Sequence, residues 1–112
     1  EWGRAAARLL LNDGAAFDAV ICQNDVLARG CIEELERNGC RVPQDVAVIG
    51  HDNSPDYVSY AHPLLTSIDD NNEMLGRQAA LCLLDAIAGH PHHGVERVPV
   101  KLIQRESTLP LD

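Results

Sequence analysis

The sequence predicts an α/β fold built on an open parallel sheet flanked by helices. Two short apolar runs, at 17–22 and 46–50, suit strands rather than amphipathic helices, and a segment with helical periodicity separates them. A strand, a crossover helix and a second apolar strand form a βαβ unit with parallel strands. Because open α/β sheets bind ligands beyond the carboxyl ends of their strands, we expect a binding site at that edge.

The elements of the first half follow in order. Residues 3–14 are rich in Ala and Leu and end at Gly14, which predicts a helix. After the strand at 17–22, Asn24 is a good N-cap for a second helix, which the Asn-Gly pair at 38–39 stops. Its apolar residues repeat at helical spacing: Leu27, Cys31 and Leu35.

Two further strands follow this helix. Pro43 favours an extended backbone before it, and the β-branched run at 46–50 suits a strand buried on both faces. Residues 64–68 form a third short apolar run, which ends in the polar cluster at 69–72. The sheet therefore gains a third strand with polar residues at its end.

A long helix and a last strand complete the pattern. Apolar residues at helical spacing predict a helix from about 72 to 88, stopped by Gly89 and Pro91. Its apolar face consists of Met74, Leu75, Ala79, Cys82, Leu83 and Ile87. Residues 96–106 alternate apolar and polar side chains, and Pro99 makes this segment an edge or bent strand.

Composition limits the functions that this chain can perform alone. Its 112 residues, of which 46% are hydrophobic, are enough for one domain. The formal net charge of −8 repels phosphate backbones, so we expect no DNA binding by this chain unaided. No apolar run reaches the length of a membrane span, and the first residues lack a signal-peptide pattern, so we expect no membrane partner.

Two groups of residues admit a metal site, and a simpler interpretation is favoured for each. The four cysteines form no Cys-x-x-Cys pair, and buried thiols in a reducing cytoplasm explain them, although the equal spacing of Cys22, Cys31 and Cys40 admits a metal. The three histidines of the loop at 89–94 could also bind one, but Gly and Pro make a solvated turn the better interpretation. We therefore expect no metal and no cofactor.

Asn24, Asp52 and Asp70 are the candidate binding residues. Each has a simpler role: Asn24 and Asp70 could only cap helices, and Asp52 could only close a turn. All three follow strands of one predicted sheet, however, so three unrelated caps would have to meet at a single edge. Carboxylates there can accept charge-assisted hydrogen bonds from ligand hydroxyls. We find no nucleophile elbow, phosphate loop or metal-ligand motif that would indicate an enzyme.

Six pieces of the sequence also carry a resemblance. In order, they lie at 24–30, 41–50, 51–55, 63–68, 74–77 and 105–108. Together they resemble the carboxy-terminal part of the lactose/galactose repressor family of bacterial transcription regulators, whose effector domain has a periplasmic-binding-protein-like fold. The resemblance implies that Asn24 and Asp52 hydrogen-bond hydroxyls of a sugar-like effector. Asp70 stands where the family often has Gln, and residues 69–72 depart from its basic-then-amide pattern, which leaves the effector's identity open.

The resemblance also implies a domain organisation. Residues 1–69 belong to the second subdomain of the effector domain, 70–90 to a helix of the first, and 95–108 to returning strands, with the DNA-binding headpiece outside this chain. A homodimer is implied, and the helix around Arg29 and Glu33 together with the loop carrying Tyr57 and Tyr60 is the expected interface. Aromatic loop residues are costly to leave in water, although local packing is the alternative.

The expected function is therefore effector sensing in a cytoplasmic transcription regulator. Its partners would be a small sugar or polyol, a second copy of the chain, and operator DNA through the headpiece alone. A periplasmic sugar-binding protein of a transport system shares this fold and is the alternative. A less favoured alternative is an enzyme on a flavodoxin-like sheet that uses Asp25 and Asp52.

Overall fold

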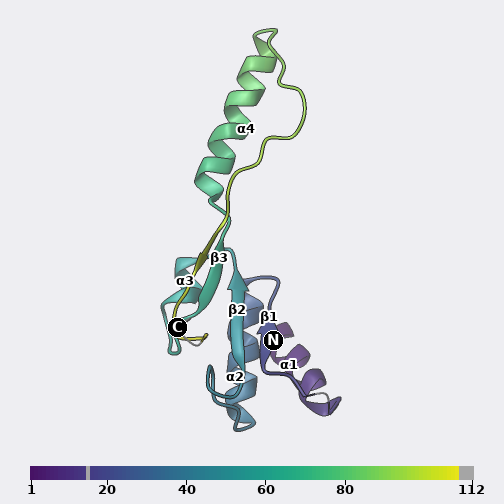
Figure 1. Cartoon of the computed structure of the whole chain (residues 1–112), viewed down its shortest axis with the longest axis vertical. Coiled ribbons are helices and arrows are strands. Elements are labelled where there is room, and N and C mark those ends of the chain that lie inside the picture. The colour runs from purple at the N-terminus through teal and green to yellow at the C-terminus, as the bar shows by residue number, and fades with distance from the viewer. Residues whose placement is uncertain (15, 109–112) are drawn as a thin grey trace.

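The computed structural model describes residues 1–14 and 16–108, which form a four-stranded sheet and four helices (Figure 1). The order along the chain is α1 (Trp2–Asn12), β1 (Ala19–Ile21), α2 (Asp25–Arg37), β2 (Ala47–His51), α3 (Pro55–Val58), β3 (Thr66–Asp69), α4 (Asn72–Ile87) and β4 (Lys101–Ile103). The α/β class is confirmed. The three predicted helices and the first three predicted strands are all present, and their boundaries move by at most two residues.

The sheet is mixed rather than wholly parallel. Its strands lie in the order β1-β2-β3-β4, and the first three are parallel. β4 pairs antiparallel with β3, with Ser67 opposite Ile103. The reason is visible in Figure 1, where α4 carries the chain away from the end of β3. Residues 88–100, the return segment, then bring it back to pair with β3. Only residues 101–103 of the expected strand at 96–106 join the sheet.

One face of the sheet is covered, so the expectation that β2 is buried on both faces is wrong. Along β2, Val48 and Gly50 are buried, whereas Ala47, Ile49 and His51 remain partly accessible. α2 packs on the buried face, and α1 packs on α2 instead of on the opposite face of the sheet. The buried apolar core consists of Ala7, Ala28, Cys31, Ile32, Leu35, Val42, Val46, Val48, Val58 and Leu65.

The helix after β1 begins and ends where the sequence predicted. Asn24 has extended backbone angles, and its Oδ1 accepts a hydrogen bond of 2.9 Å from the Leu27 amide, which caps α2. α1 crosses this helix very closely at Gly3. A Cβ atom at that position would lie only 2.1 Å from the Leu27 carbonyl oxygen. A larger residue at position 3 would therefore push the two helices apart.

The segment after β4 is fastened to the middle of the sheet by Ser107. This buried serine accepts a hydrogen bond of 2.8 Å from the Thr66 amide and donates one of 2.6 Å to the Val48 carbonyl. The Ser107 amide donates to Leu64, and its carbonyl accepts from Val48. One residue near the end of the chain thus connects the beginnings of β2 and β3.

α4 lies apart from the rest of the fold. It projects beyond the sheet edge, and the whole molecule measures 59 × 29 × 25 Å (Figure 1). None of its sixteen residues is buried, and its large apolar side chains are 44% to 75% exposed. Within the part of the chain that the structure describes, no helix is both long and apolar enough to cross a membrane.

Candidate functional site

The carboxyl ends of β2 and β3 bring two of the three predicted site residues together around a histidine. His51 Nδ1 lies 3.4 Å from an Asp52 carboxylate oxygen, and His51 Nε2 lies 3.2 Å from Asp70 Oδ1. The side chains of His51, Asp52 and Asp70 are 38%, 49% and 23% exposed. The edge therefore presents two carboxylates to solvent with an imidazole between them, as acceptors for ligand hydroxyls.

His51 was not among the predicted site residues. It is the last residue of β2, and a histidine at a strand end carries no signal by itself. Its position is set by strand pairing, because it lies opposite Ile68 in the register of β2 and β3. Asp52 is its neighbour in the sequence, but the contact of His51 with Asp70 follows from the register of β2 and β3.

The backbone at Asp52 is unusual. Asp52 has φ 100° and the next residue, Asn53, has φ 49°, a left-handed region that side-chain-bearing residues rarely adopt. The Asp52 amide donates a hydrogen bond of 2.9 Å to the Ile68 carbonyl, which fixes the turn against the end of β3. Backbone strain of this kind is often found at binding sites.

The buried side chain of Asp25 also holds this turn in place. This carboxylate is fully buried and accepts hydrogen bonds of 2.7 Å from the Ser54 amide and 2.6 Å from the Ser67 hydroxyl. Gly50 makes room for it, since a Cβ there would lie 2.2 Å from Asp25 Oδ1. Asp25 is therefore a structural group, and the flavodoxin-like enzyme alternative loses one of its two acids.

Asn53 connects the turn to an arginine that the sequence did not place nearby. Its side-chain Nδ2 donates to Asp69 Oδ2 at 3.1 Å, and its side-chain Oδ1 accepts from Arg105 Nη2 at 2.8 Å. Arg105 Nη1 donates to the Leu65 carbonyl. The chain returns through β4 and brings Arg105 beside this turn.

Asn24, the third predicted site residue, acts as the N-cap of α2. Its Oδ1 is engaged by the Leu27 amide, and the Nδ2 of the same side chain is a hydrogen-bond donor. The residue is partly exposed just beyond the end of β1, an edge strand of the sheet. The structure thus gives Asn24 its simpler role and leaves ligand contact by its Nδ2 as a prediction.

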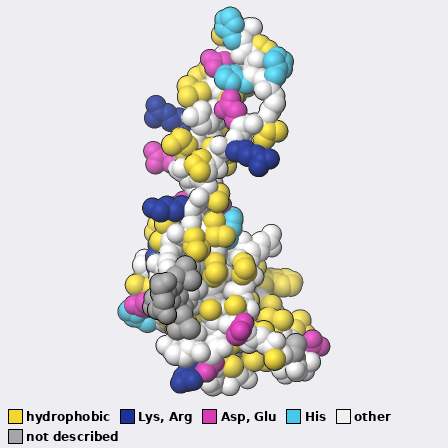
Figure 2. Space-filling view, viewed as in Figure 1, with side chains coloured by type: hydrophobic (Ala, Val, Ile, Leu, Met, Phe, Trp, Pro, Cys, Tyr) yellow, Lys and Arg dark blue, Asp and Glu magenta, His cyan; other side chains and the backbone are white. Residues whose placement is uncertain are grey.

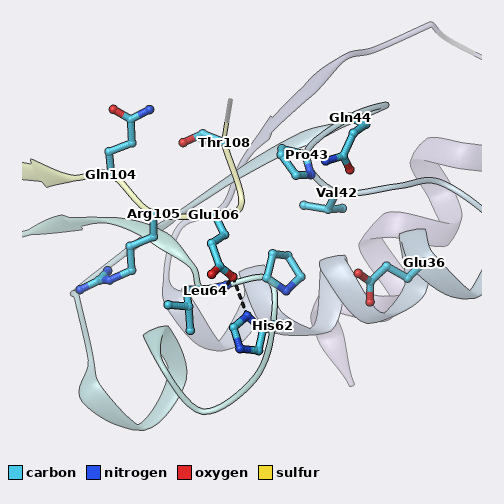
Figure 3. A pocket seen from close by; sticks show the side chains of 11 residues that line it. Glu36, Val42, Pro43, Gln44, His62, Leu64, Gln104, Arg105, Glu106 and Thr108 are labelled. Carbon is cyan, nitrogen blue, oxygen red and sulfur yellow. Dashed lines mark hydrogen bonds and ion pairs between the residues drawn. The ribbon is translucent and has the colours of Figure 1, made fainter. Parts of the chain in front are cut away.

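A cavity of about 990 Å³ lies at the opposite edge of the sheet (Figure 3). Its walls come from the end of α2, from the segments before β2 and β3 and from the segment after β4: Glu36, Val42, Pro43, Gln44, His62, Pro63, Leu64, Gln104, Arg105, Glu106 and Thr108. His62 Nδ1 lies 2.6 Å from Glu106 Oε2 inside it. The Leu64 amide and His62 lower the pKa of Glu106. This hollow is not lined by any of the three predicted site residues.

The residues expected at a dimer interface are placed differently from one another. Arg29 is only 4% exposed, and its guanidinium donates to the carbonyls of Tyr57, Val58 and Pro63. Arg29 therefore shapes the segment 55–63, the α3 loop. This segment begins with the short helix α3, where the sequence suggested only a loop. Tyr60 is 60% exposed, with its ring centroid 5.4 Å from the guanidinium carbon.

Glu33, the other expected interface residue on α2, is ion-paired within the chain. Its Oε2 accepts from Arg4 Nε at 2.7 Å, which joins α2 to α1. Both side chains remain more than a third exposed, so this pair adds little to stability. Of the four expected interface residues, Tyr60 is thus the most accessible, Tyr57 and Glu33 are partly accessible, and Arg29 is enclosed.

All four cysteines are free thiols. Cys31 is buried, as expected, but the expectation of burial is wrong for Cys22, Cys40 and Cys82, which are partly accessible. A hydrogen bond between Cys22 and Cys31, together with burial, raises the pKa of the Cys22 thiol. The same hydrogen bond lowers the pKa of Cys31, so these two thiols form a local pair across β1 and α2.

This arrangement is that of a ligand-binding α/β domain with its polar site at the carboxyl edge of the sheet. A family model described as a periplasmic binding protein-like domain matches residues 1–108. The chain belongs to the periplasmic binding protein-like domain family, in the form found in the effector-binding domain of transcription regulators of the lactose repressor family.

Three relatives are transcription regulators. The chain is 38% identical over 106 residues to the HTH-type transcriptional regulator CelR of Thermobifida fusca, covering 94% of this chain and 31% of that protein. It is 38% identical over 112 residues to the HTH-type transcriptional repressor CytR of Escherichia coli, covering 99% and 33%. It is 33% identical over 100 residues to the lactose operon repressor of E. coli, covering 89% and 28%. The chain thus spans about a third of the length of these relatives.

Solved structures give the same result. A dimeric Lac repressor with a C-terminal deletion superposes with a TM-score of 0.88 at 32% identity, over 96% of this chain and 39% of the other. A complex of the transcriptional regulator CelR with cellobiose superposes with a TM-score of 0.83 at 38% identity, over 94% and 32%. The predicted family and fold are therefore confirmed, and these relatives are regulators rather than transport proteins or enzymes.

Proposed function

We propose that this chain forms the carboxy-terminal part of the effector-sensing domain of a DNA-binding transcription regulator, and that a small sugar-like effector binds beside Asp52 and Asp70. The observation that carries the proposal is the grouping of these two carboxylates around His51 at the carboxyl edge of the sheet. The similar CelR structure holds a sugar, cellobiose, which supports the same class of ligand here. Asn24 contributes its amide nitrogen from the end of β1.

The proposed effector cleft needs a second wall from the rest of the protein. We assign residues 1–69 to one subdomain, the helix at 70–90 to the other, and 95–108 to the strands that return to the first. The exposed apolar side chains of α4 support this division, because they require a partner that the sheet in this chain does not supply.

The proposed effector is neutral or cationic and polyhydroxylated. Asp52 and Asp70 give the edge negative charge, which disfavours a phosphate ester. Arg105 is the basic group that reaches the turn, and its guanidinium donates to the Leu65 carbonyl and Asn53 instead of facing the edge as a phosphate ligand. A carboxylate that accepts two neighbouring hydroxyls would select for the stereochemistry of the ligand.

The remaining parts of the proposal concern the complete regulator. A homodimer, operator binding through a separate headpiece and action in the cytoplasm are supported by similarity to regulators and to a dimeric Lac repressor. The net charge of −8 supports DNA contact through the headpiece rather than through this chain. No catalytic step is proposed for this site.

The test uses the full-length protein and a panel of small molecules. Calorimetry with neutral mono- and disaccharides, nucleosides and the matching sugar phosphates should reveal a neutral ligand that binds and a phosphorylated form that does not. The same ligand should change the affinity for operator DNA, measured by fluorescence anisotropy. A preference for the phosphorylated form, or turnover of the bound ligand, would overturn the proposal.

A further inference from the structure

A second cluster of polar side chains lies at the far end of α4. It is well away from the effector edge, which is the carboxyl edge of the sheet that holds Asp52 and Asp70. There the chain turns at Gly89 and runs back along the helix, and histidine and acidic side chains gather on this end of the molecule (Figure 2). Cys82 and Asp85 come from the helix, and His92 and Glu96 come from the return segment. These four side chains hold the segment, which has no regular structure at this point, against α4.

Three of these residues present metal-ligand atoms to one point. A sulfur of Cys82, a ring nitrogen of His92 and a carboxylate oxygen of Glu96 all lie within 4.8 Å of one another. His92 Nδ1 is 3.0 Å from Glu96 Oε1, and Cys82 Sγ is 3.8 Å from Glu96 Oε2. With zinc–nitrogen bonds of about 2.0 Å and zinc–sulfur bonds of about 2.3 Å, tetrahedral ligands stand roughly 3.3–3.8 Å apart. An ion would therefore fit after small side-chain movements.

Asp85 supplies an independent feature of a metal site. Its Oδ2 lies 2.7 Å from His92 Nε2, the ring nitrogen that does not face Glu96. In metal sites a carboxylate commonly accepts a hydrogen bond from the second nitrogen of the ligating histidine, which fixes the ring and its tautomer. Asp85 thus orients His92 so that Nδ1 faces the point that Cys82 and Glu96 share.

We propose that Cys82, His92 and Glu96 bind one zinc-type divalent transition-metal ion, with Asp85 as the positioning residue for His92 and water at the remaining position. Thiolate and imidazole ligands favour zinc and its neighbours over calcium or magnesium, which take oxygen ligands. The bound ion fastens the return segment to α4. The sequence analysis considered a metal at Cys22, Cys31 and Cys40 and another at the three loop histidines, and favoured neither. The set proposed here shares only His92 with those groups.

The test titrates the full-length protein with Zn²⁺ alone by calorimetry and with Co²⁺ alone by absorption spectroscopy. We expect one ion per chain at this site and a thiolate-to-cobalt absorption band. Cys82→Ser should abolish the band, and His92→Ala should weaken binding at least tenfold. Asp85→Asn should weaken it by about 10–100-fold, the usual effect of altering the hydrogen-bond partner of a ligating histidine. Asp85→Glu should recover part of the affinity, because it keeps a carboxylate acceptor.

Matched controls separate this site from other thiols and imidazoles. Cys40→Ser, His93→Ala and His51→Ala should leave the affinity and the cobalt spectrum unchanged, the last because His51, Asp52 and Asp70 form the other group that could hold an ion. Hydrogen exchange in residues 90–100 should slow when Zn²⁺ is added to the unaltered protein. Absence of saturable binding, loss of binding in His51→Ala, or a cobalt complex without the thiolate band would each overturn the proposal.

Discussion

The buried Asp25 carboxylate accepts a hydrogen bond of 2.6 Å from the hydroxyl of Ser67, which joins the first turn of α2 to the middle of β3. The same Ser67 oxygen accepts a bond of 3.0 Å from the Asn53 amide, and Asp25 accepts another from the Ser54 amide. Two buried side chains therefore support both ends of the turn that carries Asp52. The stability of the domain and the shape of the effector edge depend on the same contacts.

Removing the Ser67 hydroxyl should destabilise the protein measurably. Ser67→Ala leaves the buried Asp25 carboxylate with one donor fewer, and loss of a hydrogen bond to a charged group costs about 1.5–3 kcal/mol. Urea unfolding of the full-length protein, followed by circular dichroism, measures the change in the free energy of unfolding. Ser59→Ala, which removes an exposed hydroxyl, is the control and should have little effect. Equal stability of the two variants would contradict the assigned role.

Asp52 should contribute directly to effector affinity. Asp52→Ala removes an accessible carboxylate at the strand edge, and we expect effector binding to weaken by about 1.5–3 kcal/mol, the scale of a hydrogen bond to a charged group. Calorimetry on the full-length protein with its cognate ligand measures this loss. Asp56→Ala removes an exposed acid of α3 close by in sequence and should leave the affinity unchanged. Unchanged affinity in Asp52→Ala would show that the site is assigned incorrectly.

Local signals made most of the fold predictable. The cap at Asn24 and the Asn-Gly stop of α2 act within a few residues, so the sequence located both ends of this helix. The opposite holds for the supports of the site. Asp25 contacts Ser54 and Ser67, which lie 29 and 42 residues away, and Arg105 reaches Asn53 across 52 residues. Such pairs depend on the strand register, which the apolar pattern alone does not define.

The candidate site was predicted in part for the same reason. Asp52 and Asp70 follow strands, and the rule that parallel strands present their carboxyl ends at one edge was enough to place them together. His51 between them, and the antiparallel return of β4 beside β3, needed the pairing itself. Arg29 was expected at the interface because the family resemblance implied that its helix lies there, whereas its three backbone acceptors lie on a segment 28 to 34 residues away.

The α3 loop should contribute to a dimer interface in the full-length protein. Tyr60 is an exposed aromatic ring, and Tyr57 is partly exposed next to it on the same loop. Replacing both tyrosines with Asp should produce a monomer, because the charges cannot be buried against a second copy. Sedimentation velocity measures the oligomeric state. Val95→Asp, a change at an exposed apolar residue of the return segment, is the matched control. A dimer that survives both tyrosine changes would refute this interface.

The turn before β2 should be sensitive to acid through Asp45. The Arg41 guanidinium, and then the Arg41 amide, lower the pKa of the Asp45 carboxyl from 3.8 to about 2. A folded pKa below the unfolded value means that the contact stabilises the fold above about pH 3.8 and loses its effect as the pH falls towards about 2. Carboxyl NMR titration should give this pKa directly. Arg41→Gln should raise it, whereas Arg37→Gln should not; an unchanged titration in Arg41→Gln would contradict the pairing.

Residues 1–112 in isolation should be an incomplete ligand-binding unit, because the apolar side chains of α4 lack a partner. Leu75, Leu83 and Ile87 are at least half exposed, and burying each of them is worth about 1.5–3 kcal/mol. The isolated chain should therefore bind effector poorly and either self-associate through α4 or exchange the amides of residues 72–88 rapidly. Sedimentation and hydrogen exchange separate these two behaviours, and a Leu75→Gln, Leu83→Gln double variant should reduce any self-association. A monodisperse monomer with protected α4 amides and full effector affinity would show instead that these residues form a self-sufficient domain.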